Sequence, residues 1–148
     1  MRRLCSDTER RYKMSRQQNI AIAQKLLEGI GSGQEPAKIA ALFDTDLLFE
    51  IQGDAGALPW IGRRSGRLAI ADFIRDLRAL TEPVSFDVED ILASDGRAAI
   101  VGSLQTRIKA TDRIIASQFA IILTITGDVV TRFQMLEDSF DVSKAART

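Results

Sequence analysis

Carboxylates are the side chains of this 148-residue chain best suited to moving protons, because the sequence contains no histidine. Without imidazole, a Ser-His-Asp triad and a His-ligated zinc site are excluded. Proton transfer would fall to carboxylates, Tyr12, a lysine or bound water. Asp138 is the sharpest candidate, because it ends a β-rich run at residues 129–138. In an apolar pocket its pKa would be raised and it could shuttle a proton, whereas an exposed Asp138 would bond the backbone amides of the following turn.

Strand alternation predicts which residues accompany Asp138. If Asp138 faces a pocket, Glu137 faces the opposite way, and every second residue before Asp138 also faces inward unless a bulge intervenes. That inward set is Leu136, Gln134, Arg132 and Val130. On the preceding strand, Gln118 is the one polar member of an otherwise apolar face. Gln118 is therefore either a pocket contact or a satisfied core amide, and both interpretations stay open.

Several other side chains are candidate ligand contacts. Arg107 could orient a substrate, but it shares its face with three polar residues, a pattern typical of a solvated sheet face or a polar dimer interface. Trp60 combines an indole donor with a large apolar body, which suits the rim or lid of a pocket as well as packing against a helix. Phe119 and the other phenylalanines are spread over several elements, which indicates core or pocket wall.

Four β-rich runs joined by tight turns provide the frame for these residues. They cover residues 84–93, 98–110, 113–126 and 129–138, and two of their turns hold Asp-Gly or Gly-Asp pairs. Such pairs favour hairpins because they tolerate positive φ at little cost. Strands this long twist and curl, so we expect an antiparallel meander with helices on its concave side, enclosing a pocket.

The segment before the meander predicts three helices and one strand. An apolar stripe, with a capping-box arrangement at Ser15 and Gln18, predicts a helix from about Ser15 to Gly29. Pro36 begins a short second helix, and a strand follows at residues 46–52. A glycine-rich stretch at 53–66 then leads into a third helix at 66–80. The order is α-α-β-α-β-β-β-β, an α+β layout. Three arginines around this loop could meet an anionic group or be solvated: Arg63, Arg64 and Arg67.

Length and composition indicate one globular domain at residues 14–143, with a mobile N-terminal tail at 1–13 and a C-terminal tail at 144–148. The formal net charge is zero, so no overall attraction to nucleic acid or to an anionic membrane is expected. No apolar run approaches the ~20 residues that span a bilayer. The single cysteine, Cys5, excludes an intrachain disulfide and fits a cytoplasmic location.

The element order, the Trp60-x-Gly62-x-x-x-Gly66 loop and the terminal Glu137-Asp138-Ser139-Phe140-Asp141 resemble the nuclear transport factor 2-like superfamily. Within it, the chain looks most like the SnoaL-like polyketide cyclase and ketosteroid isomerase-like branch, over residues 15–143. This resemblance implies a cone-shaped fold with an apolar pocket in its mouth, a small apolar organic ligand, no metal or other cofactor, and a homodimer formed through the sheet. The superfamily contains enzymes and non-catalytic binding modules, and both remain open.

This chain carries some, but not all, of the functional residues of these relatives. Asp138 and Arg107 match two members of the Asp-Arg-Asp arrangement of limonene-epoxide-hydrolase relatives, but Lys109 stands where the second acid would be. The base of ketosteroid isomerases falls near Ile51 or Gln52, where Glu50 or Asp54 could serve after a small change of register. Their oxyanion-stabilising acid falls at the apolar residues 119–121. The resemblance therefore implies a cofactor-free isomerase, cyclase, dehydratase or hydrolase. We expect Asp138 and Arg107 to be catalytic, and the expected ligand contacts are Trp60, Gln118, Gln134, Glu50 and Phe119.

Overall fold

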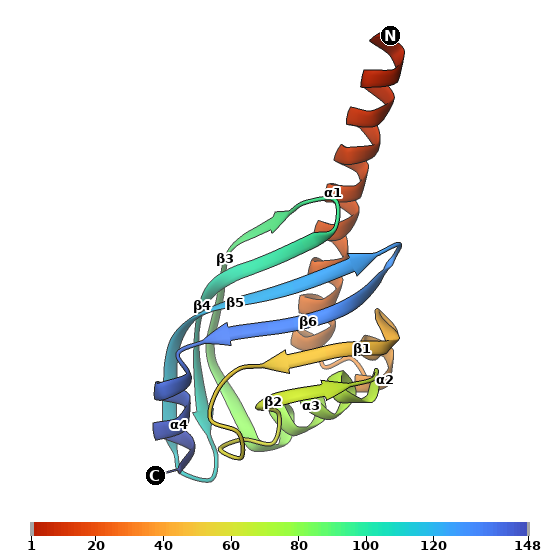
Figure 1. Cartoon of the computed structure of the whole chain (residues 1–148). Helices are drawn as coiled ribbons and strands as arrows, with labels where there is room; N and C mark the ends of the chain where they lie inside the picture. The colour runs from red at the N-terminus through yellow and green to blue at the C-terminus, as the bar shows by residue number, and fades with distance from the viewer. Residues whose placement is uncertain (1, 148) are drawn as a thin grey trace.

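The computed structural model describes the backbone of residues 2–147 and the side chains of residues 8–11 and 15–147. A six-stranded sheet has the strand order β2-β1-β6-β5-β4-β3 (Figure 1). The strands are β1 (Phe43–Ile51), β2 (Gly62–Ser65), β3 (Thr81–Ala93), β4 (Arg97–Ile108), β5 (Arg113–Thr126) and β6 (Val129–Glu137). The helices are α1 (Arg2–Gly31), α2 (Pro36–Ala40), α3 (Leu68–Leu80) and α4 (Ser139–Arg147). The predicted α+β fold is confirmed.

The four long strands form the predicted antiparallel meander. β3, β4, β5 and β6 pair in succession, and residues 98–126 contain no helix. The sheet as a whole is mixed, because β1 lies beside β6 and runs parallel to it. No hairpin joins these two strands, so their relative direction is not set by a turn. β2 adds a short antiparallel strand beside β1, within the glycine-rich stretch at 53–66.

β3 is an edge strand that departs twice from regular pairing. Its register with β4 shifts between Pro83 and Ser85, and again between Val88 and Asp90. Pro83 has no N–H to donate, which suits a strand that is paired on one side only. Gly102 of β4 lies opposite Val88, and a Cβ at Gly102 would collide with the backbone around Asp87. Glycine is therefore required where the bulged strand approaches β4.

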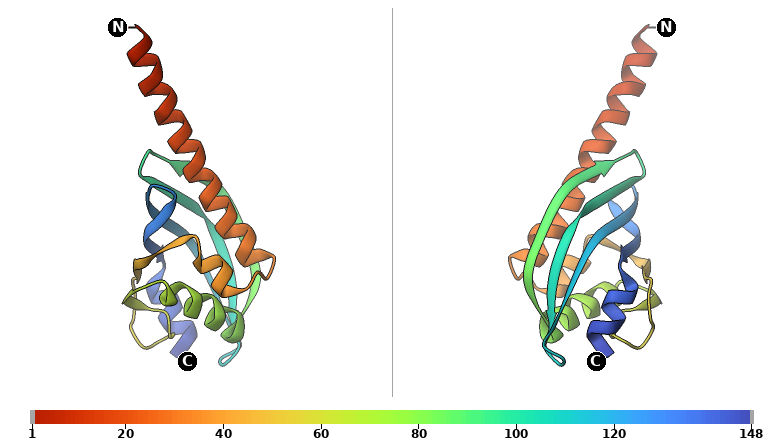
Figure 2. Two further views of the ribbon diagram at one scale, coloured as in Figure 1. Left: turned by 90° about the vertical axis from the view of Figure 1, so that its right-hand side faces the viewer. Right: turned by 90° about the vertical axis from the view of Figure 1, so that its left-hand side faces the viewer.

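The helices α1 and α3 pack on the concave face of the curved sheet, which we call the inner face (Figure 2). Between them and the sheet lies an aromatic cluster of five buried rings: Phe43, Phe49, Trp60, Phe73 and Phe133. At its centre, the rings of Phe49 and Phe133 stack with centroids 5.3 Å apart. The inside of the cone near β1 and β6 is thus filled by side chains of the protein itself.

α1 begins at Arg2, so the helix start predicted at Ser15 is wrong. The Ser15 hydroxyl donates a hydrogen bond to the backbone oxygen of Arg11, four residues earlier, which places Ser15 within the helix and not at its cap. The first turns of α1 extend beyond the sheet (Figure 1), whereas Asn19 fastens the helix to the β3–β4 hairpin. Its buried amide donates to the backbone oxygens of Ser94, at 2.9 Å, and Asp95, at 3.1 Å. That residues 1–13 are mobile and dispensable stays a prediction.

Residues 139–147 form α4, so the expected C-terminal tail is helical over residues 144–147. Val142 and Ala145 of α4 are buried, and the hydroxyl of Thr111 donates to the backbone oxygen of Ala145 at 2.7 Å. α4 thereby packs against the start of β5. In the part of the chain that the structure describes, no helix is both long and apolar enough to cross a membrane.

Candidate functional site

A row of side chains crosses the inner face of the sheet from β3 to β6. Strand register aligns Val88 with Gly102, Gly102 with Phe119, and Phe119 with Glu137. Phe86, on the same face of β3, stacks on Phe119 with ring centroids 4.8 Å apart. Phe86 and Val88 remain exposed, so this part of the apolar face is open to solvent. The row therefore presents an accessible apolar wall that ends in a carboxylate.

Glu137 is the carboxylate at the end of that row. Among the described residues its side chain has no hydrogen-bond or ion-pair partner. Burial raises the pKa of Glu137 from an ordinary 4.5 to about 7, because no neighbouring charge compensates for the lost hydration of the ionised form. A carboxyl group with this pKa exchanges protons near neutral pH, as general acids and bases do.

Asp138 does not lie on the inner face and is exposed. Its Oδ1 accepts a hydrogen bond from the backbone N–H of Asp141 at 3.1 Å, and its own N–H donates to the hydroxyl of Ser117 at 2.8 Å. Asp138 therefore caps the first turn of α4. The sequence left open whether Asp138 lies in an apolar pocket or is exposed and bonded to the following turn. The structure agrees with the second interpretation.

A bulge in β6 explains why Glu137 and Asp138 exchange faces relative to the prediction. Opposite β5, the register shifts so that Ile125 pairs with Val130 but Thr124 pairs with Arg132. The extra residue between them turns both Val130 and Phe133 into the core. Alternation from Phe133 onward then directs Met135 and Glu137 inward. In the sequence, the trace of this bulge is that the apolar residues Val130 and Phe133 are three positions apart, whereas regular alternation places residues of one face two apart.

The remaining predicted site residues are divided between the two faces. Only Phe119 lies on the inner face beside Glu137, where it is buried. Trp60 is buried against Phe73, with an edge-on contact between ring centroids 5.7 Å apart, so it belongs to the aromatic cluster. Gln118 is exposed on the opposite face, which we call the outer face. Arg107 also lies there and pairs with Asp112 at 2.9 Å.

Glu50 and Gln134 meet on the outer face, where the register of β1 and β6 places them opposite each other. The buried carboxylate of Glu50 accepts hydrogen bonds from Gln52, at 3.2 Å, and from Arg63. Gln52 and Arg63 hold the pKa of Glu50 below its ordinary value. This glutamate is therefore ionised, paired and separated from Glu137 by the thickness of the sheet.

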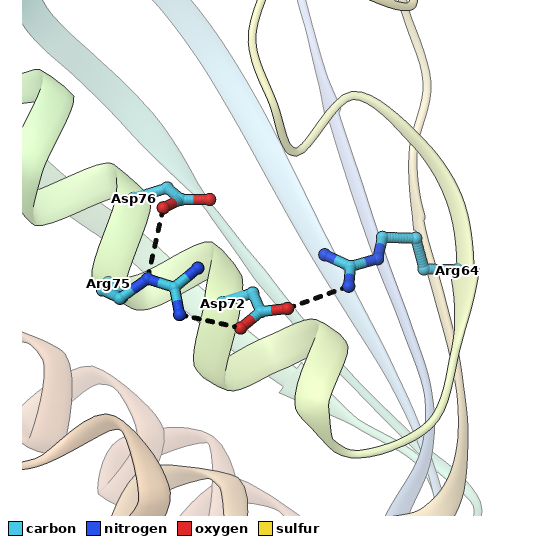
Figure 3. A network of polar contacts seen from close by, with 4 residues as sticks. All are labelled: Arg64, Asp72, Arg75 and Asp76. Atoms are coloured by element: carbon cyan, nitrogen blue, oxygen red, sulfur yellow. Dashed lines mark hydrogen bonds and ion pairs between the residues drawn. The ribbon is translucent and has the colours of Figure 1, made fainter.

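The other arginines of the glycine-rich loop have partners within the protein. Arg64 of β2 bonds Asp72 of α3 at 2.9 Å, and Asp72 also pairs with Arg75 at 3.1 Å (Figure 3). The bond from Arg64 is the main reason that the pKa of Asp72 is lowered. Arg67 donates to the backbone oxygen of Phe43 at 2.9 Å. These contacts fix the loop to α3 and β1.

The loop after β1 is also fastened to α4. The carboxylate of Asp54 accepts two hydrogen bonds from Arg147, at 2.6 and 3.1 Å, and one from the hydroxyl of Ser143 at 2.7 Å. Arg147 and Ser143 together lower the pKa of Asp54 to about 2. Asp54 is therefore a structural link between the loop and the helix that follows Glu137. No cluster of three or more His, Cys, Asp or Glu that could hold a metal occurs among the described residues.

Comparison with known proteins gives the family. Residues 23–133 match the model of the SnoaL-like domain, which is most of the chain. No curated protein sequence matches. Among solved structures, an NTF2-like protein from Burkholderia xenovorans is similar at 21% identity and a TM-score of 0.80, over 89% of this chain and 98% of that one.

Two other solved structures share the fold. A protein with a ketosteroid isomerase-like fold from Catenulispora acidiphila, solved in complex with trimethylamine, is 18% identical over 84% of this chain and 91% of its own, with a TM-score of 0.68. An NTF2-like protein from Burkholderia thailandensis is 14% identical over 86% and 96%, with a TM-score of 0.74. Identities this low establish a common fold and not a common activity. Together with the family match, they show that this chain belongs to the SnoaL-like domain family and has the NTF2-like fold.

Proposed function

We propose that this protein binds a small, largely apolar organic molecule against the inner face of its sheet and exchanges a proton with it through Glu137. The observation that carries the proposal is the position of Glu137, which ends an apolar row and has no partner among the described residues. Glu137 is half-buried, and an uncompensated carboxyl group beside an apolar wall costs stability, a combination that is found most often at functional sites.

The reaction that fits is cofactor-free acid–base chemistry. With a pKa of about 7, Glu137 is present in both protonation states at neutral pH. It can take a proton from a carbon acid or give one to a carbonyl, hydroxyl or epoxide oxygen, as isomerisation, cyclisation, dehydration and hydrolysis require. Phe119 and Phe86 would hold the apolar body of the substrate beside it. In this assignment Glu137 takes the role that the sequence suggested for Asp138, while Arg107, on the other face, has no contact with the substrate.

A second candidate function is ligand binding or dimerisation without catalysis. It is favoured by the aromatic cluster, because five buried rings fill the inside of the cone near β1 and leave the substrate only the part of the face around Phe86. A module that only binds needs an apolar wall but no proton transfer. The two candidates differ in whether a change at Glu137 affects turnover or only affinity.

The test is a screen for turnover of apolar ketones, enones and epoxides, followed by two matched variants. Glu137→Gln keeps the shape and hydrogen-bonding capacity of the side chain but cannot exchange a proton, so kcat is expected to fall by about 10²-fold or more with little change in KM. Asp138→Asn is the control, because asparagine caps a helix about as well as aspartate and should leave kcat unchanged. Loss of turnover in Asp138→Asn alone would contradict the proposal. Binding of apolar ligands without turnover of any of them would favour the non-catalytic function.

A further inference from the structure

A hollow of about 340 Å³ lies on the outer face of the sheet, along β2, β1 and β6. The side chains that matter most in it are Leu48, Glu50, Arg63, Ser65 and Arg132. Register puts Leu48 between Ser65 of β2 and Arg132 of β6, with Glu50 two residues further along β1. All five project from the face opposite to Phe49 and Phe133, so this hollow is distinct from the apolar row that ends in Glu137.

The arginines around the hollow differ in how they are paired. Arg63 is bonded to Glu50, and Arg64 at the rim is bonded to Asp72. Arg132 is only partly exposed, yet among the described residues it has neither a hydrogen bond nor an ion pair. A guanidinium always carries its charge and presents five donors in a planar fork. Arg132 therefore leaves one uncompensated cation in the hollow.

The surroundings of Arg132 limit what can bind it. Leu48 is 55% exposed and provides an apolar floor next to the guanidinium. Across this floor, the Ser65 hydroxyl has no hydrogen-bond partner in the described part of the chain, so it can donate to a ligand. Glu50 brings one negative charge, which Arg63 offsets. The hollow thus combines one free positive charge, a hydroxyl donor and a small apolar surface.

We infer that this hollow binds a small organic carboxylate, whose two oxygens accept hydrogen bonds from Arg132 and whose apolar body lies on Leu48. A carboxylate matches the planar fork of a guanidinium in a bidentate pair. Its single negative charge equals the one uncompensated positive charge, whereas a phosphate dianion would also meet the carboxylate of Glu50. The site is independent of Glu137 and of the proposed function, because it lies on the other face of the sheet.

The test is calorimetric titration of the full chain with three probes at about 0.15 M salt: cyclohexanecarboxylate, its uncharged carboxamide and inorganic phosphate. The carboxylate is expected to bind at least about tenfold more tightly than the carboxamide and the phosphate, since only it forms a charge-matched bidentate pair. Arg132→Gln should weaken carboxylate binding by about tenfold or more, and Arg132→Lys should restore only part of it. The control is Arg97→Gln, which removes an arginine from the same face but outside the hollow and should change binding less than twofold.

Three results would overturn the inference. The first is equal binding of the carboxylate and the carboxamide, which would mean that charge is not recognised. The second is an equal loss in Arg132→Gln and Arg97→Gln, which would mean that anions gather on the whole face. The third is no heat of binding for the carboxylate at millimolar concentration, although circular dichroism shows the parent to be folded. A substrate screen that fails at Glu137 would leave this result unaffected, and the converse also holds.

Discussion

Replacement of Glu137 by glutamine should change how the stability of the protein depends on pH. Below pH 4.5 the carboxyl group is protonated in both the folded and the unfolded chain. As the pH rises, the unfolded chain loses its proton first, because the pKa of Glu137 is about 7 in the folded protein. The contribution of Glu137 to the free energy of unfolding therefore falls between pH 4.5 and about 7 and is constant above that range. At about 1.4 kcal/mol for each pKa unit, the loss amounts to about 3 kcal/mol.

The glutamine variant has no proton to lose at this position, so its stability should lack this decline. Relative to the parent, it should gain about 2–3 kcal/mol between pH 4.5 and pH 8. Urea unfolding at half-unit intervals of pH measures both curves, and Asp138→Asn should follow the parent. Asp54 does not interfere, because its pKa of about 2 makes its own contribution vary only below about pH 4. Parallel curves for the parent and Glu137→Gln would refute the burial of an unpaired carboxyl group at this site.

Two further predictions concern the core and the assembly. Phe133→Ala should cost about 3–5 kcal/mol in urea unfolding, because the ring is 1% exposed and stacks on Phe49, while Phe140→Ala, at 73% exposure, should cost less than about 0.5 kcal/mol. Away from the hollow, the outer face exposes apolar side chains such as Ile114 and Leu136, so we expect a homodimer through this part of the face. Light scattering at micromolar concentration should report twice the chain mass, and Ile114→Glu should reduce it to that of a monomer. A parent protein that is monomeric under these conditions would contradict this expectation.

Most of the fold could be predicted because its signals are local. Asp-Gly and Gly-Asp turns fixed the ends of the long strands within a few residues, and the apolar stripe of α3 gave that helix directly. The parallel pairing of β1 with β6 could not be predicted, since it joins segments about 80 residues apart with no turn between them. The start of α1 was missed because Ser15 looked like a cap, although the arginines, lysine and glutamate before it favour a helix.

The candidate site was harder to predict than the fold, because it depends on one inserted residue. Asp138 and Glu137 are adjacent carboxylates, and only the bulge near Thr131 decides which of them faces the inner side. A bulge of this kind leaves no dependable mark in a single sequence. The ion-pair partners of the arginines could not be predicted from the sequence either. Arg63 and Arg64 looked free in the sequence, but each has a carboxylate partner from another element, whereas Arg132 has none among the described residues.

The irregular edge strand β3 has a consequence for how copies of this protein can meet. A long strand with an unpaired edge normally offers its N–H and C=O groups to any other extended chain, which leads to aggregation. Here Pro83 removes one donor, two bulges break the regular spacing, and exposed Asp87, Glu89 and Asp90 would repel the same edge of a second molecule. These features oppose growth of the sheet from its β3 edge, so we expect copies of the protein that associate to meet through the faces of the sheet.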